Sequence, residues 1–160
     1  MEELICREGT VHSVIFQNAE NGYTVLRLLT EEGEVVTVVG CIPCVAPGEH
    51  LTVTGTWEVH PQHGEQLKAQ ELERTLPEEE EDIFAYLSSG VCKGVGPTTA
   101  RRIVDRFGLE TLDILEAEPE RLQMIKGITV KKAMEIGELF RQHMGLRRLM
   151  EFLSRYQLPP

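Results

Sequence analysis

Long hydrophobic runs are missing from this chain of 160 residues. No stretch of about 18 uncharged apolar residues occurs, so the sequence predicts no membrane-spanning helix and no membrane partner. The N-terminal residues lack a basic segment followed by an apolar one, so we expect no secretion signal and a cytoplasmic protein. The four cysteines stand at irregular spacing, which favours reduced thiols over a disulfide framework.

Basic residues are scarce, with 16 Lys and Arg against 26 Asp and Glu, which gives a net charge of −10. This charge argues against a polyanionic partner for the chain as a whole. The charge is uneven, however: residues 1–76 carry −8, residues 77–89 carry −5 and residues 90–160 carry +3. Only the last block has the sign that a nucleic acid attracts.

Nucleotide-binding and catalytic motifs are also missing. No window reads G-x-x-x-x-G-K-[ST], so the chain has no Walker A loop. In G-V-G-P-T-T, residues 94–99, Thr99 stands where a dinucleotide-binding loop needs its third glycine. No nucleophile, base and orienting group stand in a readable arrangement, and neither does a carboxylate pair. We therefore expect no active site, no resident metal and no cofactor in these residues.

The first part of the chain has the pattern of short strands. From about Gly9 to Arg74, segments rich in β-branched residues alternate with the turn signals N-A-E-N-G, E-E-G, V-A-P-G and H-P-Q-H-G. No helical stretch between them is long enough to connect parallel strands. Five short strands of this kind predict a small antiparallel barrel of the oligonucleotide/oligosaccharide-binding (OB) type, with a flattened sandwich as the alternative.

At Pro77 the apolar residues change to a helical period. The acids of P-E-E-E-E-D suit a solvated linker and the first turn of a helix. Further helices are predicted over Pro97–Phe107, Leu109–Ala117, Pro119–Met124, Thr129–Met144 and Leu146–Tyr156. The predicted fold class is therefore α+β in two segregated parts. An OB-like barrel over residues 1–76 is followed by an all-helical domain over residues 77–160.

The helical part contains an internal repeat. L-S-S-G-V-C-K-G-V-G-P-T-T-A-R-R-I aligns with E-R-L-Q-M-I-K-G-I-T-V-K-K-A-M-E-I at an offset of 33 residues, so that Lys93 matches Lys126 and Gly94 matches Gly127. A repeat of this period indicates a duplicated supersecondary unit. Two helices joined by a tight glycine turn, present twice, predict a tandem helix-hairpin-helix domain.

Each hairpin turn has residues suited to binding a phosphate group. Glycine lets the backbone turn sharply and approach an anion, and free N–H groups at the start of the next helix face that anion. Such contacts hold a nucleic-acid backbone and read no base sequence. The predicted phosphate-binding residues are Lys93, Gly94, Val95, Gly96, Thr98, Thr99, Arg101 and Arg102 in the first hairpin and Lys126, Gly127, Ile128, Thr129, Lys131 and Lys132 in the second.

The second hairpin is degenerate, because Thr129 stands where the first has Gly96. Close approach of a backbone is easier at a glycine, so we expect the first hairpin to bind more strongly. The alternative is a linker whose glycines only permit close packing of helices.

The barrel part offers two weaker candidate sites. One is a zinc-like spacing, C-x2-C-x15-H-x2-H, although its turn positions and short histidine gap argue against a metal. The other is a set of aromatic residues that could stack on bases, although packing in the barrel is the alternative that its negative charge favours. The zinc-like residues are Cys41, Cys44, His60 and His63, and the aromatic residues are Phe16, Tyr23 and Trp57.

The motifs of both parts carry a resemblance to a known family. They are G-T-V-H-S-V-I-F-Q-N-A-E-N-G-Y-T-V-L, P-G-E-H-L-T-V-T-G-T-W and H-P-Q-H-G-E-Q-L in the barrel, with Y-L-S-S-G-V-C-K-G-V-G-P-T-T-A-R-R-I-V-D-R-F-G and L-Q-M-I-K-G-I in the hairpins. Together they resemble the N-terminal region of RecD-like (RecD/TraA-type) superfamily 1 DNA helicases. The resemblance implies that the protein continues beyond Pro160 into motor domains that bind ATP and Mg²⁺ and move 5′ to 3′ on single-stranded DNA. It also implies a role in DNA repair or recombination, with single-stranded or forked DNA and the motor domains as partners.

Two alternative functions stay open at this point. The Holliday-junction protein RuvA also joins an OB barrel to tandem hairpins, although its second hairpin usually keeps the glycine that is Thr129 here. A protein-docking module without DNA contact would suit the acidic barrel, with the motor domains, a single-strand-binding protein or a repair factor as partner.

Overall fold

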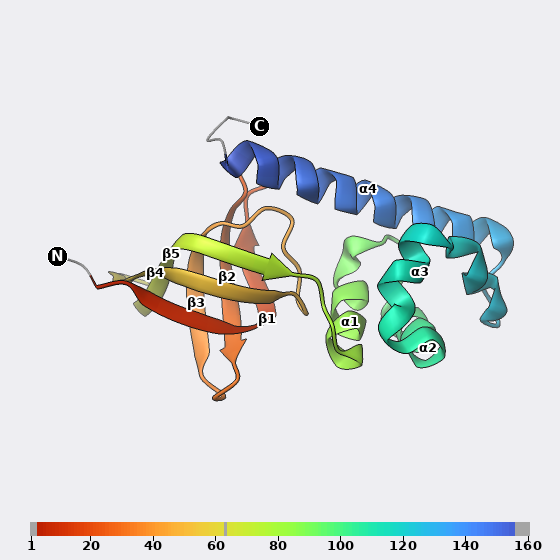
Figure 1. The fold of residues 1–160 in the computed structure, drawn as a ribbon, viewed down its shortest axis with the longest axis horizontal. Coiled ribbons are helices and arrows are strands. Elements are labelled where there is room, and N and C mark those ends of the chain that lie inside the picture. Colours follow the sequence, from red (N-terminus) through yellow and green to blue (C-terminus); the bar gives the residue numbers. More distant parts are fainter. Residues whose placement is uncertain (1–2, 63, 156–160) are drawn as a thin grey trace. The chain divides into compact units, whose positions relative to one another are not determined.

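Five strands form a closed barrel in the computed structural model, which describes residues 3–62 and 64–155 (Figure 1). The strands are β1 (Ile5–Gln17), β2 (Tyr23–Thr30), β3 (Val35–Cys41), β4 (His50–His60) and β5 (Gly64–Thr75). Their order around the barrel is β1-β2-β3-β5-β4, and each neighbouring pair is antiparallel except β3 and β5, which are parallel. The predicted five-stranded OB-like barrel is therefore confirmed.

The barrel closes around a core because its strands alternate between buried and exposed residues. In β2, Leu26 and Leu28 are fully buried, whereas Tyr23, Arg27 and Leu29 point outward. Alternate residues of a strand face opposite sides of a sheet, so one apolar face suffices to fill a small barrel. The core consists of Val11, Leu26, Leu28, Val36, Val38, Ile42, Val45, Leu51, Val53 and Leu67.

Two glycines let the strands of the barrel come close together. Gly9 takes part in both ladders of β1, facing Thr30 of β2 and Leu51 of β4. A Cβ at Gly9 would overlap the carbonyl oxygen of Leu29. A Cβ at Gly55, which lies at the irregularity between β4 and β5, would overlap a backbone carbonyl in the same way. Both positions therefore exclude any side chain.

Replacing Gly55 with alanine is expected to destabilise the barrel by about 1–3 kcal/mol, because the backbone of β5 must move to admit the methyl group. Urea unfolding followed by the fluorescence of Trp57, the single tryptophan, measures this loss. Gly145→Ala is the matched control, since nothing lies within 4 Å of a Cβ at that helical position. The control should not lower stability, and an unchanged unfolding midpoint for Gly55→Ala would contradict the packing described here.

The helical part begins at Glu80 and contains both hairpins. Acidic residues occupy the first turn of the first helix, where they interact favourably with the helix dipole. Proline stands at the first position of the helix that follows the first turn, where a missing N–H group is tolerated. The elements are α1 (Glu80–Tyr86), the π-helical turn η1 (Leu87–Val91), α2 (Pro97–Phe107), the 3-10 turn η2 (Gly108–Glu110), α3 (Thr111–Ala117), the 3-10 turn η3 (Pro119–Met124) and α4 (Val130–Arg155).

The structure has one helix where helices over Thr129–Met144 and Leu146–Tyr156 were predicted. This helix, α4, continues through Gly145. Glycine inside a helix costs about 1 kcal/mol relative to alanine, which is the reason a break was expected there. Buried side chains continue along one side of α4 on both sides of this glycine, at Phe140, Met144, Arg147 and Met150. Packing of this face outweighs the weak local preference for a break.

Packing divides the chain into two compact units. The barrel unit comprises the five strands together with the end of α4 from Arg147, and the helical unit comprises residues 77–146. The predicted domain boundary between residues 76 and 77 stays a prediction, to which the packing adds that the end of α4 belongs with the barrel. In the described part of the chain, no helix is both long and apolar enough to cross a membrane.

Candidate nucleic-acid interface

The two hairpin turns of the helical unit have the same backbone geometry. Gly94 has φ +89° and Gly127 has φ +94°, a conformation that glycine adopts readily and other residues rarely do. An equivalent hydrogen bond closes each turn, from Val95 N–H to the Cys92 carbonyl (3.2 Å) and from Ile128 N–H to the Ile125 carbonyl (3.1 Å). The repeat of 33 residues seen in the sequence is therefore also a repeat of backbone structure.

The second glycine of the first hairpin has another role. Gly96 has φ −93° and ψ −175°, which is extended backbone that any residue adopts, and nothing lies within 4 Å of a Cβ built there. Of the two glycines expected to bend the first turn, the backbone therefore needs only Gly94. Gly96 instead leaves the surface beside the turn open.

Both turns lead directly into a helix, and the helix that follows the first turn has its first N–H groups available. Ala100 N–H donates to the Gly96 carbonyl at 2.8 Å, which begins the ladder of α2. The earlier N–H groups of Thr98 and Thr99 have no partner within their own helix, and no side chain caps the start of α2. Such a helix start attracts an anion through its N–H groups and its dipole.

Thr129 gives the second hairpin a different helix start. Its carbonyl accepts the Ala133 N–H at 2.9 Å, and its hydroxyl oxygen accepts the Lys132 N–H at 3.1 Å. The hydroxyl therefore caps α4. Aligning Thr129 with Gly96 in the sequence repeat did not predict this structural role.

Most of the predicted cations surround these turns without ion pairs. Lys93, Arg102, Lys126 and Lys131 are exposed, and Lys132 is half-buried. In the described part of the chain, no carboxylate lies within ion-pair distance of any of the five. Their charges are therefore available to a ligand. Of the two predicted phosphate-binding residues with apolar side chains, Val95 is buried and Ile128 is half-buried, so only their backbone groups are suited to an anion.

Arg101 is the exception among the predicted cations, because its guanidinium is already paired. It binds the carboxylate of Glu81 through two hydrogen bonds of 3.1 Å and lies 4.0 Å above the ring of Phe84. Asp105 adds a second ion pair at 3.7 Å. The hydrogen bonds and the charge of Arg101 lower the pKa of Glu81. Arg101 therefore links α2 to α1. Glu81 and Asp105 neutralise its charge, so it attracts a phosphate less than the unpaired cations do.

Comparison with known proteins finds a matching family model in each unit. Residues 2–77 match the model of the OB-fold domain of the ATP-dependent DNA helicase YrrC, and residues 87–136 match the model of the SAM-like tandem helix-hairpin-helix. The ATP-dependent RecD2 DNA helicase of Deinococcus radiodurans is 30% identical over 153 residues, which is 91% of this chain. The chain is therefore similar, over most of its length, to the OB-fold and hairpin region of RecD-like helicases. It spans only 21% of the length of that relative.

The RecD-like match decides between the two architectures that join an OB barrel to tandem hairpins, against the RuvA-like alternative. A chain of the S. pombe Stn1-Ten1 crystal structure is also similar, with 22% identity over 45% of this chain and 57% of that chain. Its TM-score of 0.37 is too low to support any argument about this protein.

The aromatic residues of the RecD-like barrel lie in different environments. Phe16 and Tyr23 are exposed at the two ends of the turn between β1 and β2, with ring centroids 6.5 Å apart. Trp57 is partly buried against the barrel core, and the guanidinium of Arg7 lies 5.6 Å from its ring centroid. Only the first pair presents aromatic surface to a ligand.

The zinc-like spacing falls partly outside the described residues, because His63 is not among them. Among the described residues, the ligand atoms of Glu8, Glu31 and His50 lie within 4.8 Å of one another on the barrel surface. The Nε2 atom of His50 lies 3.4 Å from a carboxylate oxygen of Glu8. In the helical unit, burial raises the pKa of the Cys92 thiol to about 11, so this cysteine stays protonated and unreactive at neutral pH.

The barrel unit also contains a buried group of charges that the sequence did not predict. The carboxylate of Glu49 is fully buried and accepts hydrogen bonds from Arg74 (3.0 Å) and Arg147 (2.9 Å). Glu151 lies 3.0 Å from Arg74 and 3.5 Å from Arg147. Residues so far apart in the sequence give no local pattern by which such a group could be recognised.

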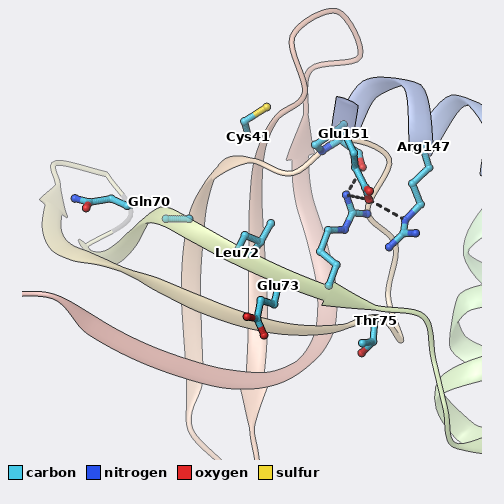
Figure 2. A pocket seen from close by; sticks show the side chains of 10 residues that line it. Cys41, Gln70, Leu72, Glu73, Thr75, Arg147 and Glu151 are labelled. Carbon is cyan, nitrogen blue, oxygen red and sulfur yellow. Dashed lines mark hydrogen bonds and ion pairs between the residues drawn. The ribbon is translucent and has the colours of Figure 1, made fainter. Parts of the chain in front are cut away.

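These arginines line a hollow of about 850 Å³ on the barrel unit, and Figure 2 shows Arg147 and Glu151 projecting toward it from α4. Polar and apolar residues of β5, among them Gln70, Leu72 and Glu73, form the opposite side. An anion would need free positive charge here, but Glu49 and Glu151 already neutralise both arginines. The group therefore holds the end of α4 to the barrel and offers no ligand site.

Proposed function

We propose that the chain is the DNA-binding part of a RecD-like helicase and that its hairpins bind the phosphate backbone without sequence specificity. The observation that supports this most strongly is the repeated turn: two positive-φ glycines, each followed directly by a helix and surrounded by cations that have no ion pair among the described residues, with open N–H groups at the start of α2. Backbone N–H groups and lysines recognise phosphate and do not contact base edges.

The charge of the segment that contains the hairpins supports assigning this function to the hairpins, although the helical unit as a whole, residues 77–146, carries −4. Residues 90–160 carry a net charge of +3, whereas residues 1–76 carry −8. Binding to DNA gains free energy chiefly when cations displace the counterions of the backbone, so an acidic surface opposes it. The barrel therefore contributes less to the affinity for DNA than the hairpins do.

Replacing Lys93 with alanine is expected to lower the affinity for DNA and to reduce the slope of log Kobs against log salt by about 0.7–0.9, the equivalent of one phosphate contact. Fluorescence anisotropy with labelled DNA at several salt concentrations measures both. The base sequence of the DNA should not change the result, because the contact is to the backbone. An unchanged slope would remove Lys93 from the interface.

We further propose that motor domains elsewhere in the same protein bind ATP and Mg²⁺ and translocate 5′ to 3′, and that the protein acts in DNA repair or recombination. The support is the RecD2 match, of which this chain spans about one fifth. The motor domains would then be partners of this chain, with single-stranded or forked DNA as the substrate. The cytoplasmic location and the lack of a cofactor in these residues stay predictions.

A second candidate function concerns the barrel alone. The exposed Phe16 and Tyr23 on an acidic barrel favour a protein partner, such as a single-strand-binding or repair protein, over a DNA strand. Phe16→Ala combined with Tyr23→Ala separates the cases. The double variant keeps its DNA affinity if the pair docks a protein, and loses affinity if the pair stacks on bases.

A further inference from the structure

A lysine of the second hairpin lies at the turn of the first. Lys132 belongs to the first turn of α4, directly after the second hairpin, yet its ammonium group lies against Gly94. A Cβ at position 94 would overlap the Lys132 Nζ atom and lie 3.6 Å from its Cε atom. The absence of a side chain at Gly94 therefore makes room for the lysine as well as for the turn.

An arginine of the first hairpin has the reciprocal position. Arg102 lies on α2, directly after the first hairpin, and its Nη1 atom lies 3.9 Å from where a Cβ of Gly127 would be. The turn glycines Gly94 and Gly127 thus each have beside them a cation from the helix that follows the other hairpin.

The internal repeat alone does not explain this crossing, in which the cation of each hairpin lies beside the turn of the other hairpin. At the offset of 33 residues, Lys132 matches Thr99 and Arg102 matches Glu135, so neither cation has a basic counterpart. The sequence of each hairpin thus supplies a cation that lies beside the turn of the other hairpin.

The charge of Lys132 is available to an anionic ligand. Its side chain is half-buried, and no carboxylate in the described part of the chain lies within ion-pair distance. A partly buried ammonium group without an anionic partner loses hydration without a compensating charge. Arg101, the first cation within α2, is already bound to Glu81 and is therefore less available than Lys132 to an anion at the first turn.

We propose that the two hairpins share their phosphate-binding sites: Lys132 completes the site at the first turn, and Arg102 completes the site at the second. This inference rests on the proposed function, because the shared ligand is the phosphate of a DNA backbone. The phosphate at the first turn contacts the N–H groups at the start of α2 together with Lys93 and Lys132. The phosphate at the second turn contacts the start of α4 together with Lys126 and Arg102.

Double-mutant cycles on the intact chain test the crossing. The affinity for a labelled single-stranded oligonucleotide is measured for Lys132→Gln combined with Lys93→Ala, and for Lys132→Gln combined with Lys126→Ala. Two residues that contact one phosphate have effects that do not add, whereas residues at separate sites have additive effects. We expect at least about twofold coupling for Lys132 with Lys93 and additivity for Lys132 with Lys126.

Arg102→Gln supplies the mirror-image cycle, with coupling expected to Lys126 and additivity with Lys93. Lys131→Gln is the matched control, because this exposed lysine precedes Lys132 on the same helix and lies beside neither glycine. In the free protein, Lys132→Gln should shift the backbone amide resonance of Gly94, and Lys131→Gln should leave it in place.

The outcomes separate this inference from the function on which it rests. If Lys132 couples to Lys126 and not to Lys93, or couples to neither, the crossing is wrong, although the hairpins still bind DNA. If none of the single variants changes the affinity or its salt dependence, the proposed function itself is wrong.

Discussion

Glu49→Gln is expected to destabilise the barrel unit by about 3–5 kcal/mol, because it removes one partner of a buried group of charges. The Glu49 side chain is 0% exposed, and those of Arg74 and Arg147 are 8% and 9% exposed. Glutamine has nearly the same shape but no charge, so both guanidinium groups would lose the anion that they share. Glu151 would remain, but its side chain is 30% exposed, so its charge is screened by solvent more than that of Glu49.

The Glu49 carboxylate also holds the loop between β3 and β4. One oxygen accepts the bonds of both arginines, and the other accepts the Ala46 N–H at 2.9 Å. Arg74 in turn donates to the Pro43 carbonyl at 2.8 Å. One side chain thus joins this loop, β5 and the end of α4. Removing its charge should therefore lower the free energy of unfolding by more than removing an ordinary ion pair does.

Trp57 fluorescence during urea unfolding measures the effect on the barrel. Glu34→Gln is the matched control, because Glu34 pairs with Arg7 at 3.4 Å in an exposed position, where ion pairs contribute little. A Glu49→Gln variant as stable as the Glu34→Gln variant would show that the buried charges do not hold the unit together.

Gly96→Val is expected to lower DNA affinity about tenfold or more, because a branched side chain would cover the N–H groups that face a phosphate. The free protein should tolerate the change. The backbone at Gly96 is extended, and nothing lies within 4 Å of a Cβ there. A loss of binding by the folded variant would therefore report on the ligand and not on the packing of the turn.

Thr129→Val is the matched variant at the equivalent position of the second hairpin. That position is already β-branched, so we expect a smaller loss of affinity than for Gly96→Val. The Thr129 hydroxyl caps α4, and removing it should cost about 1 kcal/mol of stability. Thr129→Ser keeps the cap and separates that effect from binding. If the folded Gly96→Val variant binds like the parent while Thr129→Val does not, the second hairpin is the stronger site.

Local patterns were enough to predict the elements and the turns. Segments rich in β-branched residues between turn signals predicted the barrel strands, and the repeat around Gly94 and Gly127 predicted both hairpins, because these features depend on neighbouring residues. The unbroken α4 was missed because glycine propensity is local, whereas the packing of Met144 and Met150 is not.

Contacts between distant residues account for what the sequence did not predict. Glu49 and Arg147 are 98 positions apart, and no spacing rule connects them. Lys132 and Gly94 meet only because the two hairpins pack together in the helical unit. Arg101 looked like the other basic residues of the first hairpin, and only the position of Glu81 shows that its charge is taken. Sequence patterns identified the basic residues of the turns, while the fold decides which of them stay available.

Binding by the hairpins is measured by titrating labelled single-stranded, duplex and forked DNA with the intact chain at two salt concentrations. We expect binding that weakens steeply with salt, does not depend on base sequence, and is reduced when Lys93 and Lys126 are both replaced with alanine. Replacing Arg7 and Arg27 of the barrel in the same way should have a smaller effect. Binding that is insensitive to salt, or that depends on the barrel arginines and not on the hairpin lysines, would contradict the account.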